Sequence, residues 1–177
     1  MAGSVAELRK MPAEAFLKDS KAGMGGFWPN NDGYVIAGDP REIYRQGKYN
    51  DVDVMIGSNS NEGAMFVNVP ILPAFYAASM QKAFGPLADD ALKLYPGTDG
   101  NAAMQSTRDI FRDMAFAWPA YTWATLQTGT GKANVYVYYF GQSQPERRDG
   151  VKITGASHGD EINYVFGHVK RNFNYLY

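Results

Sequence analysis

The chain has 177 residues, of which 45% are hydrophobic and 20% charged, a composition typical of one globular domain with a single core. Its 17 basic residues nearly balance 18 acidic ones, and no run of lysine or arginine occurs, so neither nucleic acid nor an anionic membrane surface is an expected partner. The absence of cysteine excludes disulfides, thiolate metal sites and a cysteine nucleophile.

The N-terminal part of the chain predicts short helices. Residues 4–7 match a capping box that opens a helix ending at residue 9 or 10. Pro12 stands where a second helix, carrying residues 13–17, can begin. The first twenty residues are charged and amphipathic, without a continuous apolar segment, so we expect no signal peptide and no membrane span in this chain.

Two apolar runs predict strands, and the long segment between them predicts helices. Asp53–Gly57 is a short apolar run bounded by polar residues, which suits a buried strand. Residues 133–140 are apolar at nearly every position, so we expect both faces of that strand to be covered, as in a central sheet strand. Pro119 should kink or split the last intervening helix. The intervening helices are expected at residues 72–84, 87–95 and 102–126.

This order of elements predicts an α/β fold with one domain over residues 1–177. The helical excursion covers about residues 64–130, which is far more than a simple crossover helix needs. We therefore expect its extra helices to wall a pocket above the sheet.

Two residues that can carry acid–base chemistry follow the predicted strands. His158 lies in a glycine-flanked loop beyond the second strand, and imidazole has a pKa suited to proton transfer near neutrality. Glu62 lies in a polar turn just beyond the first strand. Catalytic groups gather at the carboxyl ends of strands in open α/β sheets, so Glu62 could hold the Nδ1–H of His158 if the strands are neighbours. On spacing alone, a solvated Glu62 and a structural or exposed His158 remain open alternatives.

A possible nucleophile and a second possible base lie close to this histidine in sequence. Gly155-Ala156-Ser157-His158-Gly159 matches the G-x-S-x-G pattern of a nucleophile elbow. We reject Ser157 because neighbouring side chains diverge too strongly for His158 to activate it, and because the preceding stretch is largely polar. His168 is a competing base, but no acid stands out to orient it. Two histidines and scattered carboxylates form no metal-ligand spacing, so no metal is expected.

Several segments resemble the type B carboxylesterase and cholinesterase family over about residues 28–168. Residues 28–36 and 54–63 are similar to that family's P-x-x-D-G loop and to its strand ending in an acid–glycine pair. Residues 109–124 resemble its helix beside the active-site gorge, and residues 158–167 resemble its catalytic-histidine loop.

The resemblance implies a partial α/β-hydrolase fold, comprising the C-terminal part of the central sheet with the helical excursion between strands. It also implies that Glu62 is the triad acid and His158 the triad base. Glu161 matches a buried acidic position near the histidine, so we expect it to support the site without direct chemistry. The implied function is that of a serine carboxylesterase acting on a small-molecule carboxylic ester, with no cofactor.

The resemblance further implies that the nucleophile is supplied from outside this chain. In such hydrolases the order is serine, acid, histidine, and the serines before Glu62 lack an elbow. The glycine-rich oxyanion segment is not recognisable either. We therefore expect a C-terminal portion of an esterase, nearly inactive alone, whose partner is the missing N-terminal portion of the same enzyme. The lack of cysteine resembles bacterial members of the family.

Two other functions remain open at this point. The chain could be a non-catalytic interaction module of the α/β-hydrolase type, because the family includes adhesion proteins, or it could pair with a separate polypeptide that carries the serine. Six aromatic residues could line an acyl or alcohol pocket or belong to the core: Phe66, Phe75, Tyr76, Trp118, Tyr121 and Trp123.

Overall fold

The computed structural model describes residues 4–15, 29–143 and 154–168. These fall in two compact units, residues 1–40 and residues 41–177, each of which is described by itself. The prediction of a single domain over the whole chain stays a prediction.

In the first unit, the structure confirms Ser4 as the N-cap of the predicted capping box. Helix α1 (Val5–Leu8) begins after Ser4, whose side-chain oxygen accepts a hydrogen bond from the Glu7 N–H at 3.3 Å. Residues 13–15 form one further helical turn, and the rest of the predicted second helix lies outside the described residues. In the P-x-x-D-G segment, the Asp32 carboxylate accepts three backbone N–H bonds from residues 34–36, which lower the pKa of Asp32.

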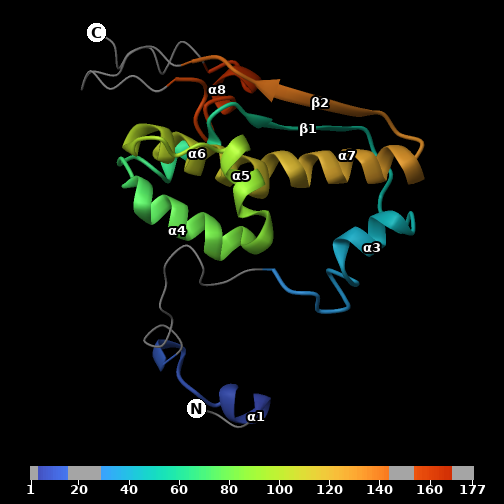
Figure 1. The fold of residues 1–177 in the computed structure, drawn as a ribbon. Helices are drawn as coiled ribbons and strands as arrows, with labels where there is room; N and C mark the ends of the chain where they lie inside the picture. Colours follow the sequence, from blue (N-terminus) through green and yellow to red (C-terminus); the bar gives the residue numbers. More distant parts are fainter. Residues whose placement is uncertain (1–3, 16–28, 144–153, 169–177) are drawn as a thin grey trace. The chain divides into compact units, whose positions relative to one another are not determined.

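The second unit contains a parallel pair of strands, β1 (Val54–Asn59) and β2 (Val135–Phe140). Their register runs from Val54 opposite Val135 to Asn59 opposite Phe140, so both carboxyl ends lie at the same edge (Figure 1). A Cβ atom on Gly57 would lie 2.0 Å from the carbonyl oxygen of Tyr138, so only glycine fits there. Both predicted strands are confirmed. The first extends two residues beyond its predicted end because pairing with β2 continues to Asn59.

The segment between the strands is helical, as predicted. Helix α6 starts where Asp99 caps it, since the Asp99 carboxylate accepts the N–H groups of Asn101 and Ala102 at 2.8 and 2.9 Å. The helices of this unit are α3 (Pro40–Arg45), η1 (Glu62–Met65), α4 (Pro73–Phe84), η2 (Gly85–Leu87), α5 (Ala88–Leu94), α6 (Gly100–Arg112), η3 (Asp113–Ala117), α7 (Trp118–Thr130) and α8 (Ile162–Val165).

The predicted long helix is divided by a π-helical turn rather than by a simple proline kink. In η3 the chain widens, and the Trp118 N–H bonds back to the carbonyl oxygen of Asp113, five residues earlier. Pro119 follows immediately, in the first turn of α7, where its missing N–H does not interrupt the helix. The helix is therefore split at the position that the proline predicted.

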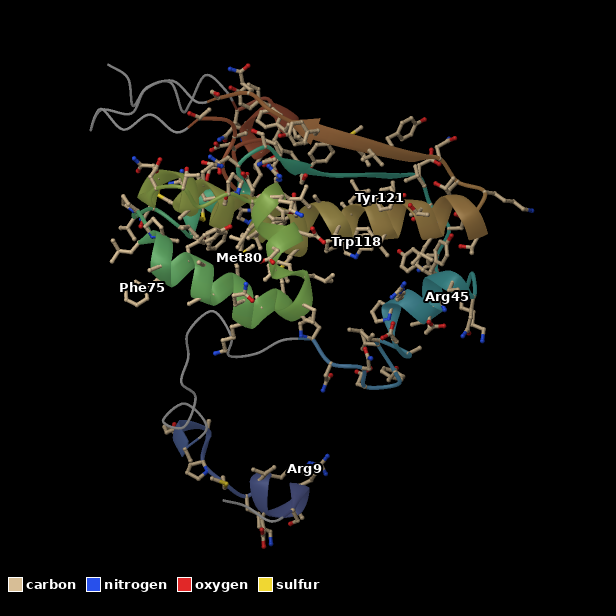
Figure 2. All side chains as sticks on the ribbon, in the orientation of Figure 1. Arg9, Arg45, Phe75, Met80, Trp118 and Tyr121 are labelled. Atoms are coloured by element: carbon tan, nitrogen blue, oxygen red, sulfur yellow. The ribbon has the colours of Figure 1, made fainter. Side chains whose placement is uncertain are left out.

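The hydrophobic core of this unit lies among α4, α5 and α6. It is built on Tyr76, Met80, Ala91 and Ala103, and Met80 is labelled in Figure 2. Helix α7 runs along the strands (Figure 1) and buries its small residues Ala120 and Ala124. The helical layer therefore packs against both strands and against η1, which follows β1.

One expectation about the second strand is wrong. We expected both faces of residues 133–140 to be covered, yet Val137 and Tyr139 are 65% and 66% exposed. The reason is that β2 pairs only with β1 within the described residues, and α7 packs against the pair without covering all of β2.

Candidate active site

The turn after β1 holds Glu62 as a buried carboxylate. Glu62 begins η1, and its Oε1 accepts the backbone N–H of Asn59 at 2.7 Å. The next residue, Gly63, must be glycine, because a Cβ there would lie 2.5 Å from the Arg108 Cα of α6. Close packing against α6 therefore fixes where the carboxylate lies.

The histidine loop follows β2 and is shaped by two glycines. Gly155 and Gly159 have φ values of +80° and +84°, a backbone region that favours glycine. The loop is joined to the turn after β1, because the Ala156 N–H donates to Ser60 Oγ at 2.8 Å and the Asn61 N–H donates to the Ala156 carbonyl at 2.8 Å. These cross-links bring the two predicted site segments together.

The side chains of Glu62 and His158 are in direct contact. The His158 Nδ1 atom lies 2.8 Å from Glu62 Oε2, and the side chain of Glu62 is 5% exposed whereas that of His158 is 43% exposed. An ionised carboxylate can only accept, so Nδ1 carries the proton and the Nε2 lone pair is left for another partner. The buried side of the ring is thus held by an acid, while its other side remains accessible to a reactant.

Two phenylalanine rings pack beside the imidazole, and a third packs on both of them. The ring of Phe116, in η3, lies 4.9 Å from that of His158, and the ring of Phe66 lies 5.8 Å from it. Phe111 packs on both, at 4.7 Å from Phe66 and 5.8 Å from Phe116. Sequence reasoning included Phe66 as a pocket candidate but missed Phe111 and Phe116, whose placement depends on the π-helical turn.

The other aromatic candidates lie elsewhere. Tyr76 is buried in the core, and its hydroxyl donates to the Tyr95 carbonyl at 2.7 Å. Phe75, Trp118 and Tyr121 are exposed on α4 and α7, where Figure 2 labels them. The indole N–H of Trp123 donates to the Gln127 side chain, 3.0 Å away.

The remaining sequence candidates are Glu161, Ser157 and His168. Glu161 Oε2 accepts a hydrogen bond from the side-chain amide of Asn59. Ser157 is buried, its N–H donates to Asp160 Oδ2 at 2.7 Å, and its carbonyl accepts from Asn59. His168 is exposed near the end of the described segment, where its backbone N–H bonds to Asn163.

The carboxylates around the histidine loop affect the protonation of their neighbours. Burial raises the pKa of Asp160, against the opposing effect of the Ser157 N–H, and the charges of Glu161 and Glu62 raise it further. Burial and the same two charges raise the pKa of the Tyr138 hydroxyl. The carboxylates of Glu62 and Glu161 therefore act on both the histidine loop and β2.

Arg112 connects the helical layer to the acid turn. Its guanidinium donates to the Ser60 carbonyl at 3.1 Å and pairs with Asp109 and Asp113 at 3.0 and 2.8 Å. Burial opposes the charge, but the Asp113 and Asp109 carboxylates more than offset it and raise the pKa of Arg112.

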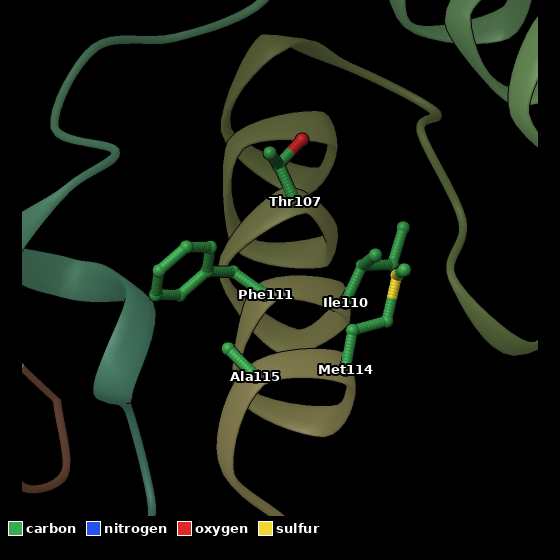
Figure 3. Close-up of a pocket in the computed structure, with 5 residues that line it drawn as sticks. All are labelled: Thr107, Ile110, Phe111, Met114 and Ala115. Atoms are coloured by element: carbon green, nitrogen blue, oxygen red, sulfur yellow. The ribbon is translucent and has the colours of Figure 1, made fainter. Parts of the chain in front are cut away.

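An apolar groove of about 380 Å³ lies on the surface of α6 and η3. Figure 3 shows its lining, which consists of Thr107, Ile110, Phe111, Met114 and Ala115. It shares Phe111 with the aromatic cluster beside His158, so an apolar surface leads away from the imidazole.

Two further findings concern the described residues as a whole. Among them, no group of three or more histidine, aspartate or glutamate side chains is arranged to hold a metal ion. None of the helices that the structure describes is both long enough and apolar enough to cross a membrane.

Comparison with known proteins decides the family. The sequence model of the carboxylesterase family matches residues 3–173. The chain belongs to the carboxylesterase family. Acetylcholinesterase of Leptinotarsa decemlineata is 26% identical over 172 residues, covering 85% of this chain and 27% of that protein.

Two other similar proteins differ in what their names state. The inactive carboxylesterase-like protein VdtD of Byssochlamys spectabilis is 24% identical over 198 residues, covering 94% of this chain and 34% of its own length. Neuroligin-3 of Mus musculus is 25% identical over 162 residues, covering 80% of this chain and 19% of its own length. The chain spans about a fifth to a third of the length of these relatives.

Solved carboxylesterase structures share the fold. A PNB esterase superimposes with a TM-score of 0.62 at 24% identity, covering 93% of this chain and 36% of that structure. A thermophilic PNB esterase gives a TM-score of 0.63 at 24% identity, with coverages of 94% and 35%. The chain has part of an α/β-hydrolase fold, which confirms the predicted fold class.

Proposed function

We propose that this chain supplies the acid and the base of a serine carboxylesterase active site that hydrolyses small-molecule carboxylic esters. The observation that carries the proposal is the 2.8 Å contact between His158 Nδ1 and the buried Glu62 carboxylate. In this assignment Glu62 orients His158, and Glu161 supports the loop without contacting the reacting atoms. The membership of the chain in the carboxylesterase family supports the reaction class.

The geometry suits a proton shuttle. With the proton on Nδ1 held by Glu62, the Nε2 atom of His158 can take the proton of a serine hydroxyl as that oxygen attacks the ester carbonyl. The resulting imidazolium is stabilised by the adjacent carboxylate and can then protonate the leaving alcohol. Water then attacks the acyl-serine with the same proton transfers through His158, which releases the carboxylic acid product and frees the serine.

The nucleophile and the oxyanion-binding amides are assigned to the N-terminal portion of the same enzyme. The chain covers 35–36% of the PNB esterase structures, which leaves ample length for those parts in a complete protein. The exposed apolar surface of β2 and the groove on α6 are surfaces that such a portion can cover. The lack of cysteine supports kinship with bacterial members.

The test is p-nitrophenyl ester hydrolysis combined with fluorophosphonate labelling. The 177-residue chain alone should show little turnover and no labelling, whereas the product of the complete gene should hydrolyse the ester and be labelled on a serine upstream of Glu62. In that product His158→Gln should abolish turnover, and Glu62→Gln should lower kcat by about 10³- to 10⁴-fold because the tautomer is no longer fixed. Stoichiometric labelling of Ser157 would overturn the assignment.

A non-catalytic interaction module is the second candidate. The similarity to neuroligin-3 and to an inactive carboxylesterase-like protein favours it. The retention of both Glu62 and His158 in contact argues against it, because a binding surface needs neither. A complete gene without an elbow serine would give this candidate precedence, unless co-purification and mass analysis reveal a separate polypeptide that supplies the serine.

A further inference from the structure

Asn59 occupies the point where the acid turn and the histidine loop meet. It is the last residue of β1, at the carboxyl end of the sheet, and it is 1% exposed. Within the described part of the chain, only Asn59 and Gln127 are large side chains that are fully buried. A buried polar side chain is retained at low cost only when its hydrogen bonds are made.

Asn59 bonds to both halves of the candidate site. Its backbone N–H donates to Glu62 Oε1 at 2.7 Å, which leaves Oε2 of the same carboxylate for His158. Its side-chain Nδ2 donates to the carbonyl oxygen of Ser157 at 2.7 Å and to Glu161 Oε2. Ser157 directly precedes His158 in the chain, so the backbone next to the base is tied to the residue that holds the acid.

The neighbours of Asn59 fix the orientation of its amide. A carbonyl and a carboxylate both face the Nδ2 end, and each can only accept a hydrogen bond. Rotating the amide by 180° would place Oδ1 against these two acceptors. Among the described residues Oδ1 has no partner, so the two donated bonds alone determine how the amide lies.

We propose that Asn59 is a positioning residue that holds the backbone at His158 and the carboxylate of Glu62 in one arrangement, so that the Nδ1–Oε2 contact persists. It never touches substrate. Its amide also donates to the Glu161 carboxylate. The inference rests on the proposed function for its catalytic meaning, but the arrangement itself can be measured without any ester.

Asn61 provides a matched control. It is also a buried asparagine in the same turn, its Nδ2 donates across to the histidine loop at the Thr154 carbonyl, 2.8 Å away, and its Oδ1 also lacks a partner among the described residues. The side chain of Asn61 bonds to the loop four residues before His158, whereas that of Asn59 bonds to Ser157, directly next to His158. Asn61→Ala removes one donated side-chain bond from the same region, so it should cost some stability, less than Asn59→Ala does, without loosening the imidazole.

The experiment follows the His158 Nδ1–H proton by NMR in the 177-residue chain. A proton held on a carboxylate gives a separate low-field signal that exchanges slowly with water, and Glu62→Gln identifies this signal by weakening it. Asn59→Ala keeps the backbone bond to Glu62 but removes both side-chain donors. We expect exchange of the His158 proton to rise by about tenfold or more, since each tenfold corresponds to about 1.4 kcal/mol and one of the lost bonds is to a charged group. Asn61→Ala should leave the exchange rate near the wild-type value.

An unchanged exchange rate in Asn59→Ala, or an equal increase in Asn61→Ala, would overturn the proposal. If Asn59→Ala does not fold, exchange of the Asn59 carboxamide protons in the unaltered chain decides the question. Slow exchange of both protons supports the proposal, and exchange at the rate of a free amide overturns it. If the complete enzyme shows no esterase activity, for example because it has no nucleophilic serine, the proposed function is refuted. The NMR test of Asn59 keeps its meaning in that case, because it needs no ester.

Discussion

Gly155→Ala tests how tightly the histidine loop is fitted to the turn after β1. The residue has a φ of +80°, and an added Cβ would lie 2.5 Å from Ser60 Oγ. An alanine at positive φ costs about 1–2 kcal/mol. Ser60 Oγ can escape the clash only by rotating, which breaks its hydrogen bond with the Ala156 N–H. Because Ala156 is 0% exposed, that N–H would be left buried without a partner, at a further cost of about 1–3 kcal/mol.

Gly159→Ala is the matched control, because it has a φ of +84° in the same loop but an added Cβ would meet only Ile162 Cδ1 at an ordinary 3.7 Å. Urea unfolding should therefore show a loss of about 1–2 kcal/mol for Gly159→Ala and about 2–5 kcal/mol for Gly155→Ala. Equal losses in the two variants would refute the reasoning, since they would mean that Ser60 moves aside without any unsatisfied group.

Two further predictions concern protonation and stability. The hydrogen bond from the Tyr95 hydroxyl to Asp113 Oδ2, at 2.7 Å, and then burial raise the pKa of Tyr95 to about 12 from an ordinary 10.0, so the folded chain should lose stability as the pH rises between these values. Tyr95→Phe should be about 1–2 kcal/mol less stable at neutral pH and should lack this alkaline loss in urea unfolding; an unchanged pH slope would contradict the assignment. Burial raises the pKa of Asp160 above its ordinary 3.8 in the folded chain. The free energy of unfolding should therefore fall as the pH rises from about 3.8 to the pKa of the folded state, because Asp160 ionises more readily in the unfolded chain. Asp160→Asn, which can still accept from Ser157, should show a smaller fall in unfolding free energy over that range, and an identical fall in both proteins would argue against the effect.

The sequence predicted the parts of the site that depend on local pattern and topology. Apolar runs located both strands, a polar turn after the first strand located Glu62, and a glycine-flanked loop beyond the second strand located His158. Parallel neighbouring strands place their carboxyl ends together, which is why the contact between these side chains could be anticipated. The role of Ser4 as a helix cap was also predictable, because it depends on residues three positions apart.

Other parts of the site depend on tertiary contacts that no local pattern reveals. Asn59 belongs to a polar run that is typical of an exposed turn, yet pairing with β2 and contacts to the histidine loop make it part of the strand and bury it. Phe116 was not distinguishable from other helical aromatics. The prediction that β2 is covered on both faces was wrong, because apolar composition does not reveal which neighbours a strand has within this chain.

The widened turn at η3 acts as a one-residue insertion in an otherwise regular helix. In a regular α-helix, side chains five positions apart point about 140° away from each other. Phe111 and Phe116 are five positions apart, yet their rings lie 5.8 Å from each other, because the helix takes one extra residue per turn at η3. Deleting Ala115 would leave the two phenylalanines four positions apart, about 40° around a regular helix, so regular winding would be restored with Phe116 and α7 still in register. A one-residue deletion should therefore be tolerated better in these five residues than in the regular turns of α6 or α7, where it rotates everything beyond it by about 100°.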